Sequence, residues 1–241
     1  MRRLDARELT GRSSTHIHWL EEPACALHVD VVAPFLALRA AAAQAGFDLL
    51  PASSFRDFSR QRVLWNAKYR GERPALDREG RLIDMSALAP AERIEAILCW
   101  SALPGASRHH WGTDLDIYDP DCLPEGVRLT LEPWEYQAGG WFAGLSDWLV
   151  DHMGEFGFFL PYDKGDELEI ESEVAFEPWH LSFRPEAKGQ RLDAKALALC
   201  LQQADIEGKQ TILTHLDEIL ARYVVPYDSG GGILLIIDYH F

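Results

Sequence analysis

The sequence predicts an α+β domain in which helices pack on one side of a mainly antiparallel sheet. Helical and strand-like segments both occur, without the regular strand–helix alternation of a parallel sheet. Residues 112–118 alternate in polarity as a strand does, and residues 141–156 repeat apolar side chains at helical spacing. The chain has 241 residues, 47% of them hydrophobic. That is enough for one sizeable core with at most an appended subdomain.

The first hundred residues are expected to form an irregular arm followed by a compact unit. The arm covers 1–27 and is polar. A helix that stops at Gly46 is expected to follow it, because glycine commonly ends helices. That helix covers 28–46. After it we expect a short strand that begins over 47–50 and ends at 53–56, a helix over 57–70, a loop over 71–90 and a helix over 91–101.

The strand over 112–118 is expected to carry an unusually acidic face. Thr113, Leu115 and Ile117 fall on one side of it, and Asp114, Asp116 and Tyr118 fall on the other. Beyond it we expect a helix over 141–156, a solvated acidic loop over 163–173 that alternatively edges a cleft, a strand over 174–183, helices over 190–203 and 211–223, a glycine turn over 230–232 and a buried strand over 233–239.

Three regions are expected along the chain: the N-terminal arm over 1–27, a core over 28–187 and a C-terminal α/β extension over 188–241 that packs on the core. The net charge is −15, which argues against a nucleic-acid partner and against attraction to an anionic membrane surface. No stretch approaches the ~20 apolar residues of a membrane span, and the N-terminus shows no signal peptide. The four cysteines form no C-x-x-C pair, and we expect free, mostly buried thiols.

His109 and Asp116 are candidate ligands of a catalytic metal ion. Catalytic zinc takes three protein ligands of the histidine and carboxylate type and keeps a fourth position open for water. His109 lies in a polar turn just before the acidic strand, and Asp116 lies on the polar face of that strand. A turn residue and a strand residue can therefore converge on one point. His110, next to His109, is the alternative ligand.

The segment Glu177-Pro178-Trp179-His180 offers the other half of the site. Residues three apart on a regular strand face opposite ways. Pro178 cannot donate to a strand ladder, so a bend there could bring Glu177 beside His180. We then expect His180 to bind the metal and Glu177 to stand beside the metal-bound water.

Together these residues resemble the VanY/VanX-type D-alanyl-D-alanine carboxypeptidases and dipeptidases. The segment 107–116 (SRHHWGTDLD) is similar to the family motif S-x-H-x-x-G-x-A-x-D, and 177–180 (EPWH) is similar to E-x-W-H. Ser54-Phe55-Arg56 with Gln61 is similar to S-x-Y-R and the glutamine that follows it. The three elements stand in the family's order and cover roughly residues 30–185.

The resemblance implies a Hedgehog/DD-peptidase-like zinc peptidase fold and a role for each matching residue. It implies that His109, Asp116 and His180 bind Zn²⁺, that Glu177 is the general base and acid, and that Arg56 stabilises the negative charge of the intermediate. The matching residues that we expect at the substrate site are Ser107, Gln61 and Ser54. Asp114, on the same strand face as Asp116, is a further candidate to contact substrate.

Two positions depart from the family pattern. Phe55 replaces the motif's tyrosine, and Asp114 replaces its alanine. Asp114 could support a neighbouring metal ligand, attract a cationic group of the substrate or alter the choice of metal. The sequence leaves these three roles open.

The resemblance implies a hydrolase that acts on peptidoglycan-derived peptides ending in D-Ala-D-Ala. One alternative is an endolysin-like L-Ala-D-Glu endopeptidase of the same fold, and another is a non-catalytic zinc-containing binding module like the Hedgehog signalling domain. A carboxypeptidase needs a cation for the substrate carboxylate, and the candidates are Arg60, Arg108 and Arg184. A cell-wall substrate would require export or release, whereas the sequence by itself indicates the cytoplasm. The oligomeric state is left open.

Overall fold

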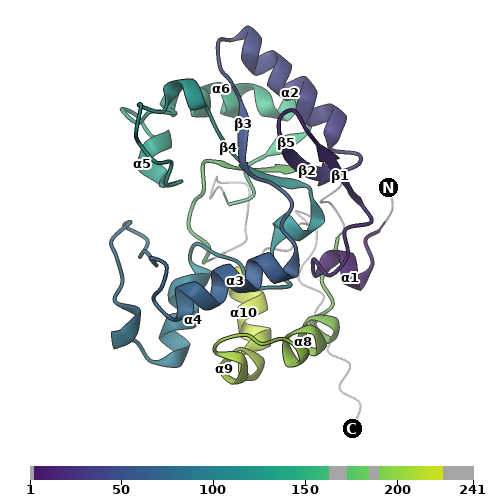
Figure 1. The fold of residues 1–241 in the computed structure, drawn as a ribbon, viewed down its shortest axis with the longest axis vertical. Coiled ribbons are helices and arrows are strands. Elements are labelled where there is room, and N and C mark those ends of the chain that lie inside the picture. The colour runs from purple at the N-terminus through teal and green to yellow at the C-terminus, as the bar shows by residue number, and fades with distance from the viewer. Residues whose placement is uncertain (1–2, 163–172, 185–189, 225–241) are drawn as a thin grey trace.

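The centre of the molecule is a four-stranded antiparallel sheet with the strand order β3-β4-β6-β5 (Figure 1). The computed structural model describes residues 3–162, 173–184 and 190–224. The sheet consists of β3 (Leu50–Ser53), β4 (Asp114–Tyr118), β5 (Phe158–Phe159) and β6 (His180–Phe183). The antiparallel sheet with packed helices confirms the predicted α+β class.

Two helices, α2 (Val32–Gln44) and α6 (Ala143–His152), cover the apolar face of the sheet. They run together along one end of the molecule in Figure 1. Successive residues of a strand point to opposite faces, so Leu115 of β4 and Leu181 of β6 enter this core and are fully buried. The polar face of the same strands is left for chemistry. We call this part of the molecule the sheet half.

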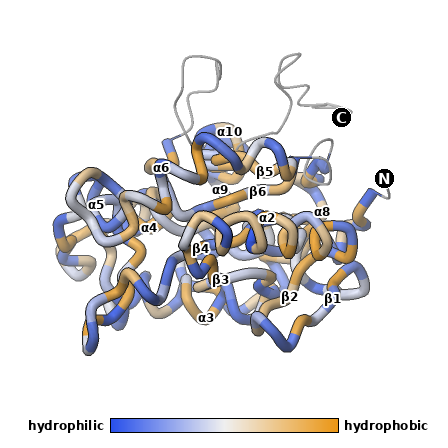
Figure 2. Tube along the Cα trace, turned by 90° about the horizontal axis from the view of Figure 1, so that it is seen from above, coloured by the Kyte–Doolittle hydropathy of each residue, from blue (hydrophilic) through white to orange (hydrophobic). Residues whose placement is uncertain are grey.

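A second hydrophobic core is built from helices alone, and we call this part the helical half. Figure 1 shows it on the opposite side of a gap between the ribbons. In Figure 2 the tube of α10 carries both hydrophobic and hydrophilic colours, as expected of an amphipathic helix. The helices of this half are α3 (Phe58–Tyr69), α4 (Pro90–Leu98), α8 (Ala194–Gln203), α9 (Lys209–Thr214) and α10 (Leu216–Tyr223).

The prediction of an irregular arm over 1–27 is wrong. Asp5 caps a short helix, α1 (Ala6–Leu9), by accepting from two backbone N–H groups of its first turn. The segment then forms an antiparallel hairpin of β1 (Ile17–Leu20) and β2 (Cys25–His28). These elements are too short for their periodicity to be read from the sequence.

Most other elements lie where the sequence predicts them, with ends shifted by a few residues. The helix expected over 211–223 is two helices, α9 and α10, which meet at His215. The strand expected over 174–183 is shorter, because only β6 pairs. The remaining short elements are α5 (Pro133–Tyr136) and the 3-10 turns η1 (Met85–Ala87), η2 (Arg108–Trp111), η3 (Pro120–Cys122) and η4 (Met153–Phe156).

Some expectations fall outside the described residues, namely the glycine turn over 230–232, the strand over 233–239 and nearly all of the acidic loop over 163–173. All four cysteines are free, and three of them are buried, as expected. Within the described ranges, no helix has the length and apolar character needed to cross a membrane.

Candidate metal centre

Strands β4 and β6 place two predicted metal ligands opposite each other. Asp116 and His180 are register partners in the antiparallel ladder, so their side chains leave the same face of the sheet. His180 Nδ1 lies 3.2 Å from Asp116 Oδ1. The neighbours Leu115 and Leu181 point to the other face and into the core. The alternation of both strands therefore collects the carboxylate and the imidazole on one polar face.

His109 reaches the same point from η2, the 3-10 turn that precedes β4. The turn ends at Gly112, whose φ of 69° lies in the left-handed region that favours glycine. A Cβ at this position would stand 2.6 Å from the backbone nitrogen of His28. The glycine thus permits the tight approach that aims His109, whose Nε2 lies 3.3 Å from Asp116 Oδ2.

His109 and His180 are each oriented by a hydrogen bond from the outer ring nitrogen, the one that points away from the other candidate ligands. His109 Nδ1–H donates to the carbonyl oxygen of Ser54 at 2.9 Å, and His180 Nε2–H donates to Asp114 Oδ1 at 2.9 Å. Because these oxygens only accept, the inner nitrogens, His109 Nε2 and His180 Nδ1, keep lone pairs for a metal. With Asp116 they form a buried group whose ligand atoms all lie within 4.8 Å of one another. Two imidazoles and one carboxylate match the donor set of a catalytic zinc site.

The electrostatics of this group also suit a cation. Burial alone would lower the pKa of His180, but hydrogen bonds to Asp114, Asp116 and Glu177 raise the pKa well above 6.5. The same carboxylates that favour a proton on Nδ1 favour a metal ion there, and binding of the metal would release the proton. Burial alone would raise the pKa of Asp116, yet the charges and hydrogen bonds of His109 and His180 lower it below 3.8. The acidic ligand therefore stays ionised, as cation binding requires.

Glu177 stands beside the three ligands, on the turn that leads into β6. The backbone N–H of His180 donates to the carbonyl oxygen of Glu177 at 3.1 Å, and Pro178 lies within this turn. The turn brings Glu177 Oε2 to 3.2 Å from His180 Nδ1. The bend predicted at Pro178 is confirmed, and the carboxylate lines the same cleft as the three ligands.

Arg56 is fixed near Asp116 by two polar side chains. Its guanidinium donates to Gln61 Oε1 at 2.7 Å and to Ser53 Oγ at 2.8 Å. Its Nη2 lies 3.8 Å from Asp116 Oδ2. Burial lowers the pKa of Arg56, while the charges of Asp116 and Glu177 oppose that effect. An arginine stays protonated at such a site, so a fixed positive charge stands at the edge of the metal position.

Asp114 lies behind His180. It accepts from Arg108 Nε at 2.8 Å and also from the hydroxyl of Thr113. Arg108 is held in turn by Ser182 Oγ at 2.5 Å. Burial alone would raise the pKa of Asp114, but the charge of Arg108 and the hydrogen bond from His180 keep it below 3.8. Of the three roles left open for Asp114, this geometry supports the orientation of a metal ligand.

His110, the alternative ligand, has both ring nitrogens engaged by the backbone. Its Nε2 accepts from the N–H of Gly105 at 3.0 Å, and its Nδ1–H donates to the carbonyl oxygen of Arg56 at 2.5 Å. Burial lowers the pKa of His110 to about 3, so the ring is neutral. The geometry therefore favours His109 as the ligand and gives His110 a structural role.

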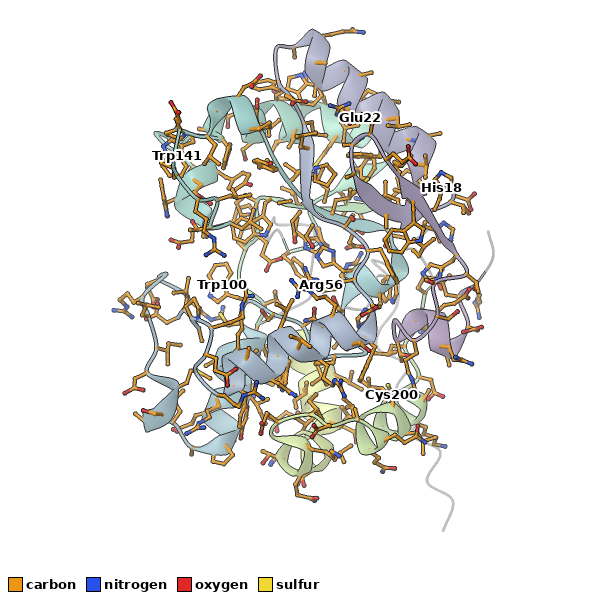
Figure 3. All side chains as sticks on the ribbon, viewed as in Figure 1. His18, Glu22, Arg56, Trp100, Trp141 and Cys200 are labelled. Carbon is orange, nitrogen blue, oxygen red and sulfur yellow. The ribbon has the colours of Figure 1, made fainter. Side chains whose placement is uncertain are left out.

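The three candidate ligands open on a cleft of 980 Å³ between the sheet half and the helical half. Figure 3 shows Arg56 and Trp100 in the space between these two halves. Of the four residues predicted to contact substrate, Ser107 lines the cleft, whereas the side chains of Gln61, Ser54 and Asp114 support other residues. Their roles in substrate binding stay predictions.

Three cleft residues were not found from the sequence. The ring of Tyr162 lies 4.9 Å from that of His180, edge to face, and Lys68 and Ser101 line the cleft near Trp100. Lys68 could have been found, because it follows Gln61 by seven residues on a predicted helix and so shares its face.

Of the three candidate cations chosen from the sequence, Arg108 alone lines the cleft. Arg108 is buried against Asp114 at 2.8 Å. Arg60 is exposed, and Arg184 lies over the ring of Phe159. Neither of these two lines the cleft.

Comparison with protein families gives an independent result. The profile of the VanY family, described as D-alanyl-D-alanine carboxypeptidase, matches residues 24–186. This range contains all the metal-site residues described above and ends before α8.

Similar proteins were found by sequence and by structure. An uncharacterized protein of Haemophilus influenzae is 40% identical over 125 residues, which cover 51% of this chain and 93% of that protein. The putative carboxypeptidase YodJ of Bacillus subtilis is 28% identical over 145 residues, covering 59% of this chain and 41% of YodJ. The structure of VanYB in complex with D-alanine-D-alanine matches with a TM-score of 0.50 and 20% identity, over 85% of this chain and 87% of that one. This last likeness concerns the fold.

Proposed function

The chain belongs to the VanY family of D-alanyl-D-alanine carboxypeptidases, and we propose that it is a zinc-dependent peptidase acting on peptidoglycan-type peptides. The proposed activity is that of a D-alanyl-D-alanine carboxypeptidase or dipeptidase. The observation that carries the proposal is the buried convergence of His109 Nε2, His180 Nδ1 and an Asp116 carboxylate oxygen, with the carboxylate of Glu177 beside them.

In this proposal His109, Asp116 and His180 hold the metal ion. Zinc in such a site lowers the pKa of a bound water from ~15.7 toward ~7 and polarises the carbonyl under attack. Ser54 and Asp114 keep the two imidazoles in the required tautomer by accepting from their outer nitrogens.

Glu177 is the proposed proton carrier. Its Oε2 lies 3.2 Å from His180 Nδ1, so it would be within reach of a water activated at the metal site. Glu177 Oε2 takes a proton from the attacking water and later delivers it to the nitrogen of the departing D-alanine. General acid–base catalysis of this kind contributes about 10²–10⁴ in rate.

Arg56 is the proposed electrostatic partner of the carbonyl oxygen. Ser53 and Gln61 hold its guanidinium in place before substrate arrives, so little reorganisation is needed when negative charge develops on that oxygen. Donors arranged in advance in this way are worth more than mobile ones.

The direct test is product analysis on defined muropeptides. The zinc-loaded protein is incubated with a peptide ending in D-Ala-D-Ala, and the products are identified by mass spectrometry. Release of one free D-alanine from this peptide supports the carboxypeptidase. In a parallel incubation with the dipeptide D-Ala-D-Ala as substrate, its cleavage supports the dipeptidase. Cleavage at an L-Ala-D-Glu bond would replace both with an endopeptidase. Failure to cleave any of these peptides while zinc is bound would overturn the proposed activity.

A further inference from the structure

The helical wall of the cleft carries a lysine in a prepared position. On α3, Gln61, Leu64 and Lys68 follow at helical spacing, so they share one face of the helix. Leu64 and Lys68 line the cleft that contains the metal ligands. Lys68 Nζ donates to Ser101 Oγ at 2.6 Å. The hydroxyl fixes the amine without neutralising its charge.

Lys68 forms no ion pair within residues 3–162, 173–184 and 190–224. A lysine ammonium has three donors, and one of them is used by Ser101. Burial lowers the pKa of Lys68 to about 8, an effect that the charge of Glu177 partly offsets. A partly desolvated cation of this kind attracts an anion more strongly than an exposed one does.

Two hydrogen bonds and one peptide bond connect Lys68 to Gln61, which holds Arg56. Ser101, its partner, is followed by Ala102, whose carbonyl oxygen accepts from Gln61 Nε2 at 2.6 Å. The other end of the Gln61 amide holds Arg56. One short segment after α4 therefore fixes the position of the Lys68 amine directly and the position of the Arg56 guanidinium through Gln61.

Trp100, the residue before Ser101, contacts the segment that carries Glu177 and His180. The ring of Trp100 stacks on that of Trp179, with centroids 6.1 Å apart and planes 22° apart. Trp179 stands in the chain between Glu177 and His180. Lys68, bound to Ser101, therefore lies at the end of the cleft that contains Glu177.

Other cations of the cleft are less suited to hold a small anion. Arg56 is already engaged by Ser53 and Gln61 beside the metal position. Arg73 and Arg128 line the cleft but are exposed, so water screens their charge. Lys68 combines partial burial, a fixed position and free donors.

We infer that Lys68, held by Ser101, binds the free C-terminal carboxylate of the peptide substrate. The inference rests on the proposed peptidase function and deepens it. A site that requires a terminal carboxylate next to the cleaved bond selects an exopeptidase over an endopeptidase. It also replaces the three arginines considered from the sequence with a residue of the helical half.

The test compares two peptides that differ only at the C-terminus. One is an N-acetylated peptide ending in D-Ala-D-Ala as the free acid, and the other is its C-terminal amide. Binding is measured by calorimetry at pH 7 in the zinc-loaded Glu177→Gln protein, in which turnover is suppressed. We expect the acid to bind about ten- to hundredfold more tightly than the amide, as a hydrogen bond between charged groups in a partly buried site allows.

Three further substitutions are made in the same Glu177→Gln protein. Lys68→Met should remove the preference for the acid while leaving the amide affinity within about twofold, and Ser101→Ala should reduce the preference by a smaller factor. Lys195→Met is the matched control, because Lys195 is an exposed lysine of α8, and it should change neither affinity. The Ser101→Ala variant removes a single hydroxyl, so it reports on the site even if Lys68→Met does not fold.

The outcomes separate this inference from the proposed function. An acid preference that persists in Lys68→Met, or that is absent from the starting protein, overturns the assignment of Lys68. If the wild-type enzyme also cleaves acid and amide peptides at equal rates, the peptidase proposal stands and the inference fails. If the wild type cleaves neither peptide while the acid preference depends on Lys68, the binding site stands and the catalytic proposal fails.

Discussion

The sheet half and the helical half contribute to the cleft in different ways. The sheet half holds its reactive groups by strand register and by hydrogen bonds to their outer atoms, as with Asp116 opposite His180 and Asp114 behind it. The helical half presents Lys68 on one helix face, with a single hydroxyl to hold it. The first arrangement fixes the geometry that chemistry needs, and the second offers charge to a substrate.

The two halves also differ in their relation to the family. The match over 24–186 contains the whole central sheet together with α3 and α4, but it leaves out α8, α9 and α10. Those three helices complete the core on which α3 and α4 rest. The position of the helical wall therefore depends on a part of the chain that the family pattern does not describe.

The largest expected effect concerns the sheet half. Glu177→Gln should lower kcat by about 10²–10⁴, because the side chain can no longer take the proton of the attacking water. Zinc content should stay at the wild-type level, since Glu177 is not one of the three ligands. Steady-state kinetics and metal analysis of the same sample measure both quantities. A variant that turns over near the wild-type rate would remove Glu177 from the mechanism.

A core substitution in the helical half should separate stability from metal binding. Leu197 is fully buried in the helical core, so Leu197→Ala should lower the free energy of unfolding by about 2–5 kcal/mol. Zinc affinity of the folded protein should stay within about twofold, because the ligands belong to the sheet half.

The matched control for this change lies on the same helix. Leu199 is 58% exposed, and Leu199→Ala should change the unfolding free energy by less than about 0.5 kcal/mol. Denaturant unfolding and competitive zinc titration measure the two effects. Loss of zinc from folded Leu197→Ala would show that the halves are not independent in this respect.

Asp114→Asn tests the support behind His180. An amide can present its N–H₂ group toward His180 Nε2, so the tautomer that leaves Nδ1 free is no longer enforced. Removal of such a partner typically weakens metal binding by about 10–100-fold. Asp119→Asn is the control, since Asp119 is also buried and follows β4 but contacts neither histidine. Equal zinc affinities in the two variants, measured against a chelator, would count against the role of Asp114.

A smaller effect should appear in the pH dependence of peptide binding. The pKa of Lys68 is lowered to about 8 by burial, and the charged groups around it are Glu177, Arg56 and Arg73. Cys99 also faces it, but burial raises the pKa of that thiol above 9.0, so it stays neutral at pH 8. As pH rises through the pKa of the free lysine, the amine loses its charge and affinity for the acid peptide should fall.

The size and position of this loss can be stated for the Glu177→Gln protein. Removing the carboxylate of Glu177 takes away a charge that raises the pKa of Lys68, so the loss should begin at or below pH 8. The fall is at most about tenfold per pH unit, and the affinity for the amide peptide should stay flat. Calorimetry between pH 6 and pH 9 measures both curves. Parallel curves for the two peptides would contradict a titrating lysine at the carboxylate.

The comparison also explains what the sequence could predict. The metal site follows from local patterns, because a turn before an alternating strand and a proline bend before a second strand are short-range features. His109, Asp116, Glu177 and His180 were found this way, and their predicted convergence is confirmed. The alternation of polar and apolar residues likewise located β4.

The rest of the site depends on contacts between distant segments. Asp114 meets His180 because β4 and β6 pair in the sheet, and Lys68 meets Ser101 because α3 and α4 pack together. Neither contact leaves a periodic signal in the sequence. The N-terminal hairpin was missed because its two strands have only four residues each.

The central claim is that His109, Asp116 and His180 form one metal site in the sheet half, and zinc content tests it most directly. The wild-type protein and His180→Ala are dialysed against limiting zinc, and the zinc content per chain is measured by elemental mass spectrometry. Circular dichroism shows that both proteins are folded. We expect about one zinc per chain in the wild type and almost none in the folded variant. Full zinc occupancy in folded His180→Ala would contradict the site.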